Sequence, residues 1–572
     1  LDNMNELTAF PDNLFGNDPD ETIINAFPGT VTVSGTFDEL ASIGKQAFAG
    51  VRLLRFSGTF PALMTINNEA FANNQDVRQQ DQTSFVTLNN VAVETVGNLA
   101  FTGFAGTVTF SGNHLIVIGY AAFAVVRKIV FTGAFDNVVI FGQFAFVQQC
   151  DAARRRRRAG GVTPTHCNPG GFDAESSVHI STAAGNNALT SVPIGAFGVF
   201  AGTVTFGGTF TGVITIESQA FAFANKVIFT AILPAVQTIA DDAFHFIEAD
   251  TSSVAFSDMR ALTTIPDTLF GADVPNGRHA FRGTVTVTGN FDELVSIGNA
   301  AFDGANVVIF DANCPKVKTI GEAAFARVKA DTSEVTLNSM GQLTHILGNA
   351  FTDYPGTVTV TGLFDELVSV GTNAFERANK VIFDANCPKV TTIDTNAFNG
   401  VVHTASTVTI NSMAKLQTIG DRAFNAFKGT VTANGPYSEL ITIGVRAFFN
   451  LVNPLSTVRI TSSATLQTIG TEAFRSFLGT AVVTGDCDEL TSIGESAFLG
   501  ARVVIFTANC PKVTAIPKNA FGLIGGALTF SGAFDALERI EEYAFGYNQE
   551  PFLNPDYDIT FGELPALTFI EV

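Results

Sequence analysis

One stretch, residues 291–302, constrains the fold more than any other part of the sequence. It reads Phe-Asp-Glu-Leu-Val-Ser-Ile-Gly-Asn-Ala-Ala-Phe, and its pattern of an aliphatic residue, an aliphatic-Gly pair and an Ala-Phe pair returns along the chain. Aligned on the Phe of the Ala-Phe pair, most copies lie roughly 22 to 26 residues apart, which is the period of a solenoid rather than the length of a domain. Such units must stack, because one unit is too small to bury its own apolar face.

Each unit has the same internal order. A run of β-branched residues comes first, such as Thr-Val-Thr-Val-Thr at 284–288 or Val-Val-Ile-Phe at 307–310, and this predicts a short strand that pairs in parallel with its neighbours. The aliphatic-x-x-Ile segment predicts a second short extended piece, and the Ala-Phe segment predicts one helical or 3-10 turn. The expected fold class is therefore mainly β with short helical or 3-10 turns, arranged as a solenoid of about 22 stacked coils.

The Phe of the Ala-Phe pair should form a buried column along the solenoid, because it occupies one fixed position in every coil. The members of this predicted structural ladder are Phe48, Phe302, Phe325, Phe351, Phe375, Phe398, Phe424, Phe448, Phe474, Phe498, Phe521 and Phe545. A Gly lies four residues before many of them, as at Gly298 and Gly444. Either a positive φ angle or a tight corner of the coil accounts for this Gly.

A longer period is superimposed on the single coils between Phe291 and Met413. Units that open with Phe-Asp-Glu-Leu, Cys-Pro-Lys-Val and Met-x-x-Leu alternate in that order, so three coils form one duplicated block. We expect solenoid coils over 1–146, an irregular insert over 147–185 and continuous coils over 186–572, within one repeat domain overall. The longer insertions fall on one edge of the solenoid, which is either a recognition edge or a place of neutral loop variation.

Composition excludes several classes of function. A formal net charge of −21 argues against nucleic acid as a partner, because phosphate binding needs a basic face. Polar residues interrupt each apolar run before it reaches about 18 residues, so no membrane span is expected. The 7 His are scattered without paired metal-ligand spacing, and no phosphate-binding loop or nucleophile elbow is present. We expect no enzyme activity and no catalytic, cofactor-binding or metal-binding residues.

Four of the cysteines share one slot of the repeat, which other units fill with Phe or Met. This indicates small buried hydrophobic side chains at Cys314, Cys387, Cys487 and Cys510. Cys487 and Cys510 lie in adjacent coils, so a disulfide between them stays open as an alternative.

The large insert carries the other two cysteines, Cys150 and Cys167, and we predict a disulfide between them in an extracellular protein. Between them lie five consecutive arginines, Arg154, Arg155, Arg156, Arg157 and Arg158. On an acidic chain this run is a solvated loop, a site for a processing protease, or an element that docks on an acidic surface of another copy or on a polyanion.

The segment Leu-Thr-Ser-Ile-Gly-Glu-Ser-Ala-Phe at 490–498 closely resembles the BspA-like leucine-rich repeat family. Leu-Ile-Thr-Ile-Gly at 440–444 and Leu-Gln-Thr-Ile-Gly at 466–470 repeat the match, and the resemblance covers nearly all of the chain apart from the large insert. It implies a leucine-rich-repeat-like solenoid. The family consists largely of surface and secreted proteins used in adhesion and binding, which implies an extracellular or cell-surface location.

Two functions from different classes follow. Neither end of the sequence resembles a polar cap, so the first hypothesis is a non-enzymatic scaffold that assembles head to tail with itself into a filament or lattice. Its candidate interface comprises the Arg run, Leu1, Leu567, Ile570 and Val572. The alternative is an adhesin or binding module that holds another surface protein or a matrix partner through its loop edge.

Overall fold

The computed structural model describes residues 1–2, 4–16, 27, 29–73, 84–148, 173–183, 185–247, 249–271, 280–461, 463–546 and 556–571. Contacts divide the chain into two compact units, Leu1–Phe291 and Asp292–Val572. Within the described ranges every regular element is a β-strand, and most coils contribute one longer strand and one strand of two residues. The predicted solenoid of stacked parallel strands is confirmed, whereas the domain boundaries expected at 146 and 185 stay a prediction.

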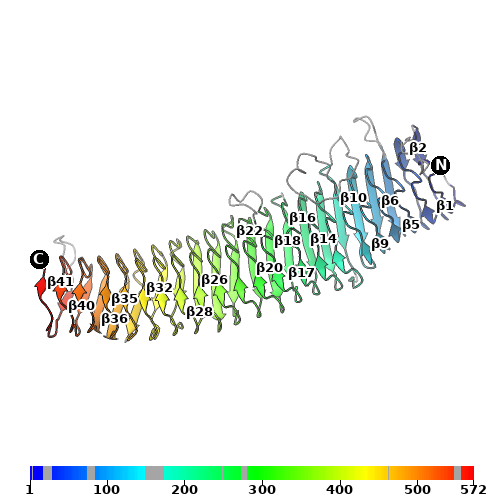
Figure 1. Ribbon diagram of the computed structural model, residues 1–572. Helices are drawn as coiled ribbons and strands as arrows, with labels where there is room; N and C mark the ends of the chain where they lie inside the picture. Colours follow the sequence, from blue (N-terminus) through cyan, green and yellow to red (C-terminus); the bar gives the residue numbers. More distant parts are fainter. Residues whose placement is uncertain are drawn as a thin grey trace. The chain divides into compact units, whose positions relative to one another are not determined.

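In the first unit, the even-numbered strands are the longer ones and pair in parallel with their neighbours (Figure 1). They are β2(Thr30–Val33), β4(Leu53–Phe56), β6(Phe85–Val91), β8(Thr107–Gly112), β10(Lys128–Ala134), β12(Ser177–Ser181), β14(Thr203–Thr209), β16(Lys226–Ile232), β18(Ser253–Ser257) and β20(Thr284–Asn290). The short strands are β1(Ala9–Phe10), β3(Ser42–Ile43), β5(Thr65–Ile66), β7(Thr95–Val96), β9(Val117–Ile118), β11(Ile140–Phe141), β13(Ser191–Val192), β15(Thr215–Ile216), β17(Thr238–Ile239) and β19(Thr264–Ile265).

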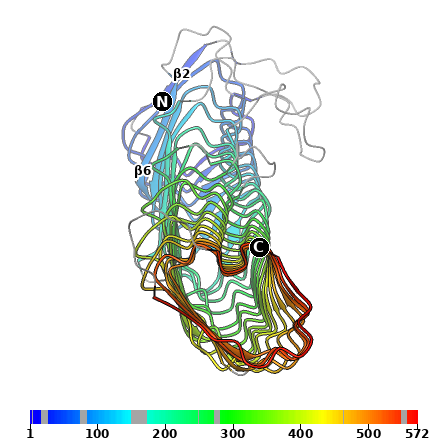
Figure 2. The ribbon, with the colours of Figure 1, turned by 90° about the vertical axis from the view of Figure 1, so that its left-hand side faces the viewer.

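The second unit repeats this arrangement, and Figure 2 shows its coils following one another along nearly the same path. Its longer strands are β22(Val307–Asn313), β24(Glu334–Asn338), β26(Thr357–Leu363), β28(Lys380–Asn386), β30(Thr407–Thr409), β32(Thr430–Ala433), β34(Thr457–Thr461), β36(Thr480–Asp486), β38(Val503–Asn509), β40(Ala527–Phe530) and β42(Asp556–Ile559). Its short strands are β21(Ser296–Ile297), β23(Thr319–Ile320), β25(His345–Ile346), β27(Ser369–Val370), β29(Thr392–Ile393), β31(Thr418–Ile419), β33(Thr442–Ile443), β35(Thr468–Ile469), β37(Ser492–Ile493), β39(Ala515–Ile516), β41(Arg539–Ile540) and β43(Phe569–Ile570).

Alternation of side chains places the core between the longer and the shorter strands. In β26, Val358 and Val360 are buried while Thr357 and Thr359 stay half-exposed, as the two-residue period of a strand requires. Most short strands present a hydroxyl-bearing or aliphatic residue outward and bury the residue that follows, for example Ile419 in β31. Both strand types therefore face one apolar interior.

The Phe of the Ala-Phe pair fills that interior with a stacked column. From Phe302 to Phe545 the successive ring centroids lie 4.9 to 5.5 Å apart, with interplanar angles from 1° to 14°. In the first unit the rings of Phe146 and Phe197 stack at 5.5 Å, although the large insert separates them in sequence. Such pairs contribute about 0.5–1.5 kcal/mol each beyond the burial of their area.

The segment around Ala-Phe is a turn and not the expected helical or 3-10 turn. In most coils the residues two before and two after the Phe have positive φ, as at Asn396 (57°) and Gly400 (69°) around Phe398. Left-handed residues that alternate with right-handed ones cannot continue a helix. The N–H groups of Asn396, Phe398 and Gly400 instead all donate to carbonyls of the next coil, at 2.9, 2.7 and 2.8 Å.

Positive φ does not explain the Gly that recurs four residues before the Phe in many coils. Gly444 is not among the residues with positive φ, so that interpretation was wrong. A Cβ at Gly444 would lie 2.5 Å from the backbone nitrogen of Asp421 in the preceding coil. The other interpretation, a tight corner, agrees with this close approach of two backbones.

A buried serine recurs before every third longer strand from β6 to β30, and once more before β34, two coils later. Where the register between two longer strands shifts, as in β28 against β30 (Ile382↔Thr407), the earlier strand projects past the start of the later one. In six such places the serine before the later strand is buried, and its Oγ accepts a backbone N–H of the earlier strand at 3.1 to 3.3 Å. These residues are Ser84, Ser176, Ser252, Ser333, Ser406 and Ser456.

Candidate functional site

The residues expected to form an interface are in part outside the described ranges. Cys150, Cys167, Arg154, Arg155, Arg156, Arg157, Arg158 and Val572 lie there, so the disulfide and the docking role of the Arg run stay predictions. Leu1 is exposed, and its amino group donates to the carbonyl of Thr32 at 3.0 Å. Leu567 is half-buried, and Ile570 in β43 is exposed and pairs with Ile540. Leu1 and Ile570 belong to different units.

The Phe ladder is a core element. Phe302, Phe398 and Phe498 are completely buried, and the stacked rings leave no face open to a ligand. The remaining described members of the predicted ladder are buried in the same way, apart from Phe545, which is half-buried. These side chains therefore hold the coils in register, and recognition has to come from the outer faces.

The outer face of the longer strands in the second unit is broad and rich in β-branched residues. We call it the long-sheet face. Parallel pairing aligns two rows on it, with Thr336, Thr359, Ile382, Thr407 and Thr430 in the first and Thr409, Thr432, Thr457 and Thr480 in the second. All of them are half-buried except Thr407, which is exposed, and threonine dominates both rows. Parallel pairing holds these side chains at the inter-strand spacing of about 4.8 Å, so the face is regular and preorganised.

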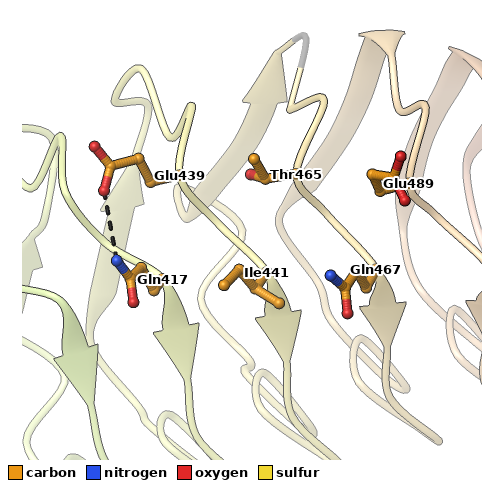
Figure 3. Close-up of a pocket in the computed structure, with 6 residues that line it drawn as sticks. All are labelled: Gln417, Glu439, Ile441, Thr465, Gln467 and Glu489. Carbon is orange, nitrogen blue, oxygen red and sulfur yellow. Dashed lines mark hydrogen bonds between the residues drawn. The ribbon is translucent and has the colours of Figure 1, made fainter.

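A shallow groove lies on the opposite, short-strand side (Figure 3). Its volume is about 320 Å³. It is lined by Gln417, Ile441 and Gln467, which directly precede β31, β33 and β35, and by Glu439, Thr465 and Glu489, which lie on the turns that lead to β33, β35 and β37. Gln417 Nε2 donates to Glu439 Oε2 at 3.5 Å.

The charges of this groove are already balanced. Glu489 pairs with Lys512 at 2.6 Å, and Glu439 pairs with Lys415; hydrogen bonding from Lys415 lowers the pKa of Glu439. The groove is also open to solvent, and all its lining residues except Ile441 have polar or charged side chains, unlike the concave apolar pockets that hold small molecules. It carries no argument for a bound cofactor.

The turn edge of the second unit carries a polar network. Arg377 forms a bidentate ion pair with Asp353 at 2.7 and 2.9 Å, and its guanidinium lowers the pKa of that carboxyl. The amide of Asn396 donates to Asn373, whose own amide donates to Asn349, at 3.0 and 3.1 Å. These side chains cross-link successive coils, and they bind one another instead of pointing toward a shared centre.

The four cysteines of the repeat are buried free thiols. Burial raises the pKa of Cys314 and of Cys387 to about 12, and the hydrogen bond with Cys487, together with burial, raises the pKa of Cys510. Cys487 and Cys510 lie side by side, because Cys487 N donates to the carbonyl of Asn509 at 2.9 Å. The thiols of Cys314 and Cys387 are therefore poor nucleophiles, since the thiolate is the reactive form.

Neither a metal cluster nor a membrane helix is found within the described ranges. No three His, Cys, Asp or Glu side chains of those residues converge on a point where a metal ion could bind. The same ranges contain no helix with the length and apolar character that crossing a bilayer requires.

Comparison with known proteins identifies the repeat. The model of the BspA type leucine-rich repeat region matches residues 25–153, 277–404 and 391–524, in 6 copies. A search of curated proteins finds no match to the sequence.

Two solved structures are similar to parts of the chain. The first is a leucine-rich cell surface protein from Faecalibacterium prausnitzii, with 20% identity, coverage of 50% of this chain and 74% of that chain, and a TM-score of 0.25. The second is the leucine-rich repeat ectodomain of the plant membrane receptor kinase GASSHO1/SCHENGEN3 from Arabidopsis thaliana, with 6% identity, coverage of 91% and 73%, and a TM-score of 0.13.

Proposed function

Because the chain belongs to the BspA type leucine-rich repeat family, we propose that it is a non-enzymatic binding scaffold, displayed at the cell surface or outside the cell. Its partner is a protein of another surface or of a matrix. The partner rests on the long-sheet face of the second unit.

The observation that carries this proposal is the regularity of the long-sheet face. Its two rows present mostly half-buried Thr side chains from successive strands, on a backbone held by parallel pairing and by the stacked Phe column. A preorganised surface loses little conformational entropy when a partner docks. Repeat proteins use such extended surfaces for binding.

The location is tested on intact source cells. Brief treatment with an added protease should release peptides of this chain while a cytoplasmic marker stays whole. Cleavage that occurs only after lysis would overturn the surface location.

The binding face is tested with two matched triple variants of the purified protein. Thr359→Lys/Thr409→Lys/Thr432→Lys alters the long-sheet face, and Thr392→Lys/Thr442→Lys/Thr468→Lys alters the short-strand side. Fibronectin, laminin and collagen surfaces serve as probes in a biosensor assay. We expect the first variant to weaken binding at least about tenfold, since buried charges at an interface are costly, and the second to bind like the parent. Equal behaviour of the two variants contradicts the assignment of the face.

Head-to-tail self-assembly, expected from the sequence, stays a prediction. Sedimentation velocity over a range of concentrations measures it with the same preparation. Growth of large species with concentration would support head-to-tail self-assembly, and a constant sedimentation coefficient would contradict it.

A further inference from the structure

An exposed apolar stripe with basic neighbours runs along the edge that leads into the longer strands of the second unit. Its members occupy one position, four residues after the Phe of the Ala-Phe pair, in five successive coils. They are Val402, Lys428, Val452, Leu478 and Arg502. Leu455, at the tip of the loop that follows Val452, is 74% exposed and lies beside the stripe. We call these six residues the edge patch.

Hydrogen bonds between coils show that the edge patch is continuous. Lys428 N donates to the carbonyl of Val401 at 3.1 Å, Leu478 N to that of Leu451 at 2.9 Å, and Arg502 N to that of Phe477 at 2.9 Å. The coils of Lys428 and Val452 are joined by the side chain of Asn453, whose Nδ2 donates to Thr430 Oγ1 at 3.0 Å. With strands about 4.8 Å apart, five coils give a stripe of about 19 Å.

The stripe of the edge patch exposes three apolar side chains. Val402, Val452 and Leu478 are exposed by 46%, 40% and 39%, and the aliphatic stem of Lys428 can continue the stripe between them. Contiguous exposed apolar side chains with a polar rim mark interaction surfaces. Leu455 is held outward by a tight turn in which its N–H donates to Asn453 Oδ1 at 2.9 Å, so little order has to be created on binding.

The charge around the edge patch has one sign. Lys428 and Arg502 belong to it, and Lys380 and Arg459 lie on the adjoining strands β28 and β34. The ion pairs formed among the described residues include none of these four cations, whereas Lys389, Lys415 and Lys512 on the short-strand side are all paired. On a chain of net charge −21, this is a basic surface whose cations form no ion pair with any carboxylate in the described ranges.

We propose that the edge patch binds an acidic polypeptide segment that also carries apolar side chains. The cations attract its carboxylates, and the Val and Leu side chains receive its apolar residues. The apolar stripe favours a polypeptide over a sugar polyanion, which has no such side chains to bury. This proposal rests on the proposed binding function and names the chemistry of the partner.

The test uses fluorescein-labelled synthetic peptides and measures fluorescence polarisation on the full chain. The main probe is three repeats of Asp-Leu-Glu-Leu, the neutral probe is three repeats of Asn-Leu-Gln-Leu, and the charge-only probe is a glutamate oligomer of the same length. We expect the main probe to bind at least about tenfold more tightly than either of the others, with affinity falling as salt is raised.

Variants of the chain locate the site. Lys428→Glu/Arg502→Glu should weaken binding of the main probe at least about tenfold, and Leu455→Ser about threefold or more. Lys428→Gln/Arg502→Gln serves as a second, milder variant should the charge reversal disturb folding, which circular dichroism reports. The matched control is Lys318→Glu/Val445→Ser, which changes an exposed cation and an exposed apolar residue on the other side and should bind like the parent.

Three outcomes overturn the proposal. The glutamate oligomer binds as tightly as the main probe, which would indicate a general polyanion site. The patch variants bind like the control, which would place the peptide elsewhere. The chain dimerises and the patch variants abolish the dimer, which would make a second copy the occupant. Loss of matrix binding in the long-sheet variant is a separate result, so failure of the edge patch and failure of the proposed function can be told apart.

Discussion

Replacing Ser406 by Ala tests the idea that buried serines allow the register to shift between coils. In β28 the residues Lys380 and Val381 project past the start of β30, because pairing begins at Ile382↔Thr407. The N–H of Val381 therefore has no strand carbonyl opposite and donates to Ser406 Oγ at 3.2 Å. Ser406 is completely buried, so water cannot replace the hydroxyl without opening the coil.

The magnitude follows from the loss of one acceptor. A buried N–H left without a partner costs about 1–3 kcal/mol, because the variant folds with the same backbone but with an unsatisfied donor. In a stacked array this cost falls on neighbouring coils and not on the whole chain. Local opening near Val381 should become more frequent by about 5- to 150-fold.

Native-state hydrogen exchange read by mass spectrometry measures this opening. We expect faster exchange in peptides that contain Val381 and unchanged exchange in coils far from it. Ser492→Ala, which removes an exposed hydroxyl from β37, is the matched control. Equal protection of Val381 in Ser406→Ala and in the parent would refute the role assigned to the serines.

Two further predictions concern backbone strain and titration. Leu523 is exposed and has a φ of 53°. Leu523→Gly should relieve about 1–2 kcal/mol of left-handed backbone strain, against a cost of about 0.5–1 kcal/mol from added chain entropy. A higher midpoint of urea unfolding would support this prediction, and a lower one would count against it. The buried thiol of Cys387 has its pKa raised from 9.0 to about 12, so its neutral form stabilises the fold fully below pH 9, and this contribution is lost as pH rises toward 12. The parent should therefore lose more thermal stability over that range than Cys387→Val, and identical pH dependence of the two would argue against the assignment.

The repeat itself was predictable from sequence, because its strongest signals are local. The Phe of each Ala-Phe pair recurs at a fixed place, and β-branched runs such as Thr-Val-Thr-Val favour strands. A buried column and parallel strands follow from these patterns alone. Local patterns did not predict the conformation of the turn around Ala-Phe. There Asn396 and Gly400 adopt positive φ while their N–H groups donate to carbonyls of the next coil.

The register shifts and the edge patch needed three-dimensional information. A serine before a strand, such as Ser406, looks like an ordinary turn residue until the projecting end of the previous strand is seen beside it. Val402, Lys428 and Leu478 share one slot but not one chemistry, so no motif marks them. An alignment of all coils on the Phe would have shown that this slot holds an apolar or a basic residue in five successive copies.

The turn edge gives the array a direction. At Phe398 three N–H groups, from Asn396, Phe398 and Gly400, all donate to the coil that follows in the sequence. During synthesis on a ribosome, a coil can thus complete its turn bonds only after the next one has emerged, while its strands already pair with coils made earlier. Folding is therefore vectorial, and the newest coil is always the least complete part of the chain.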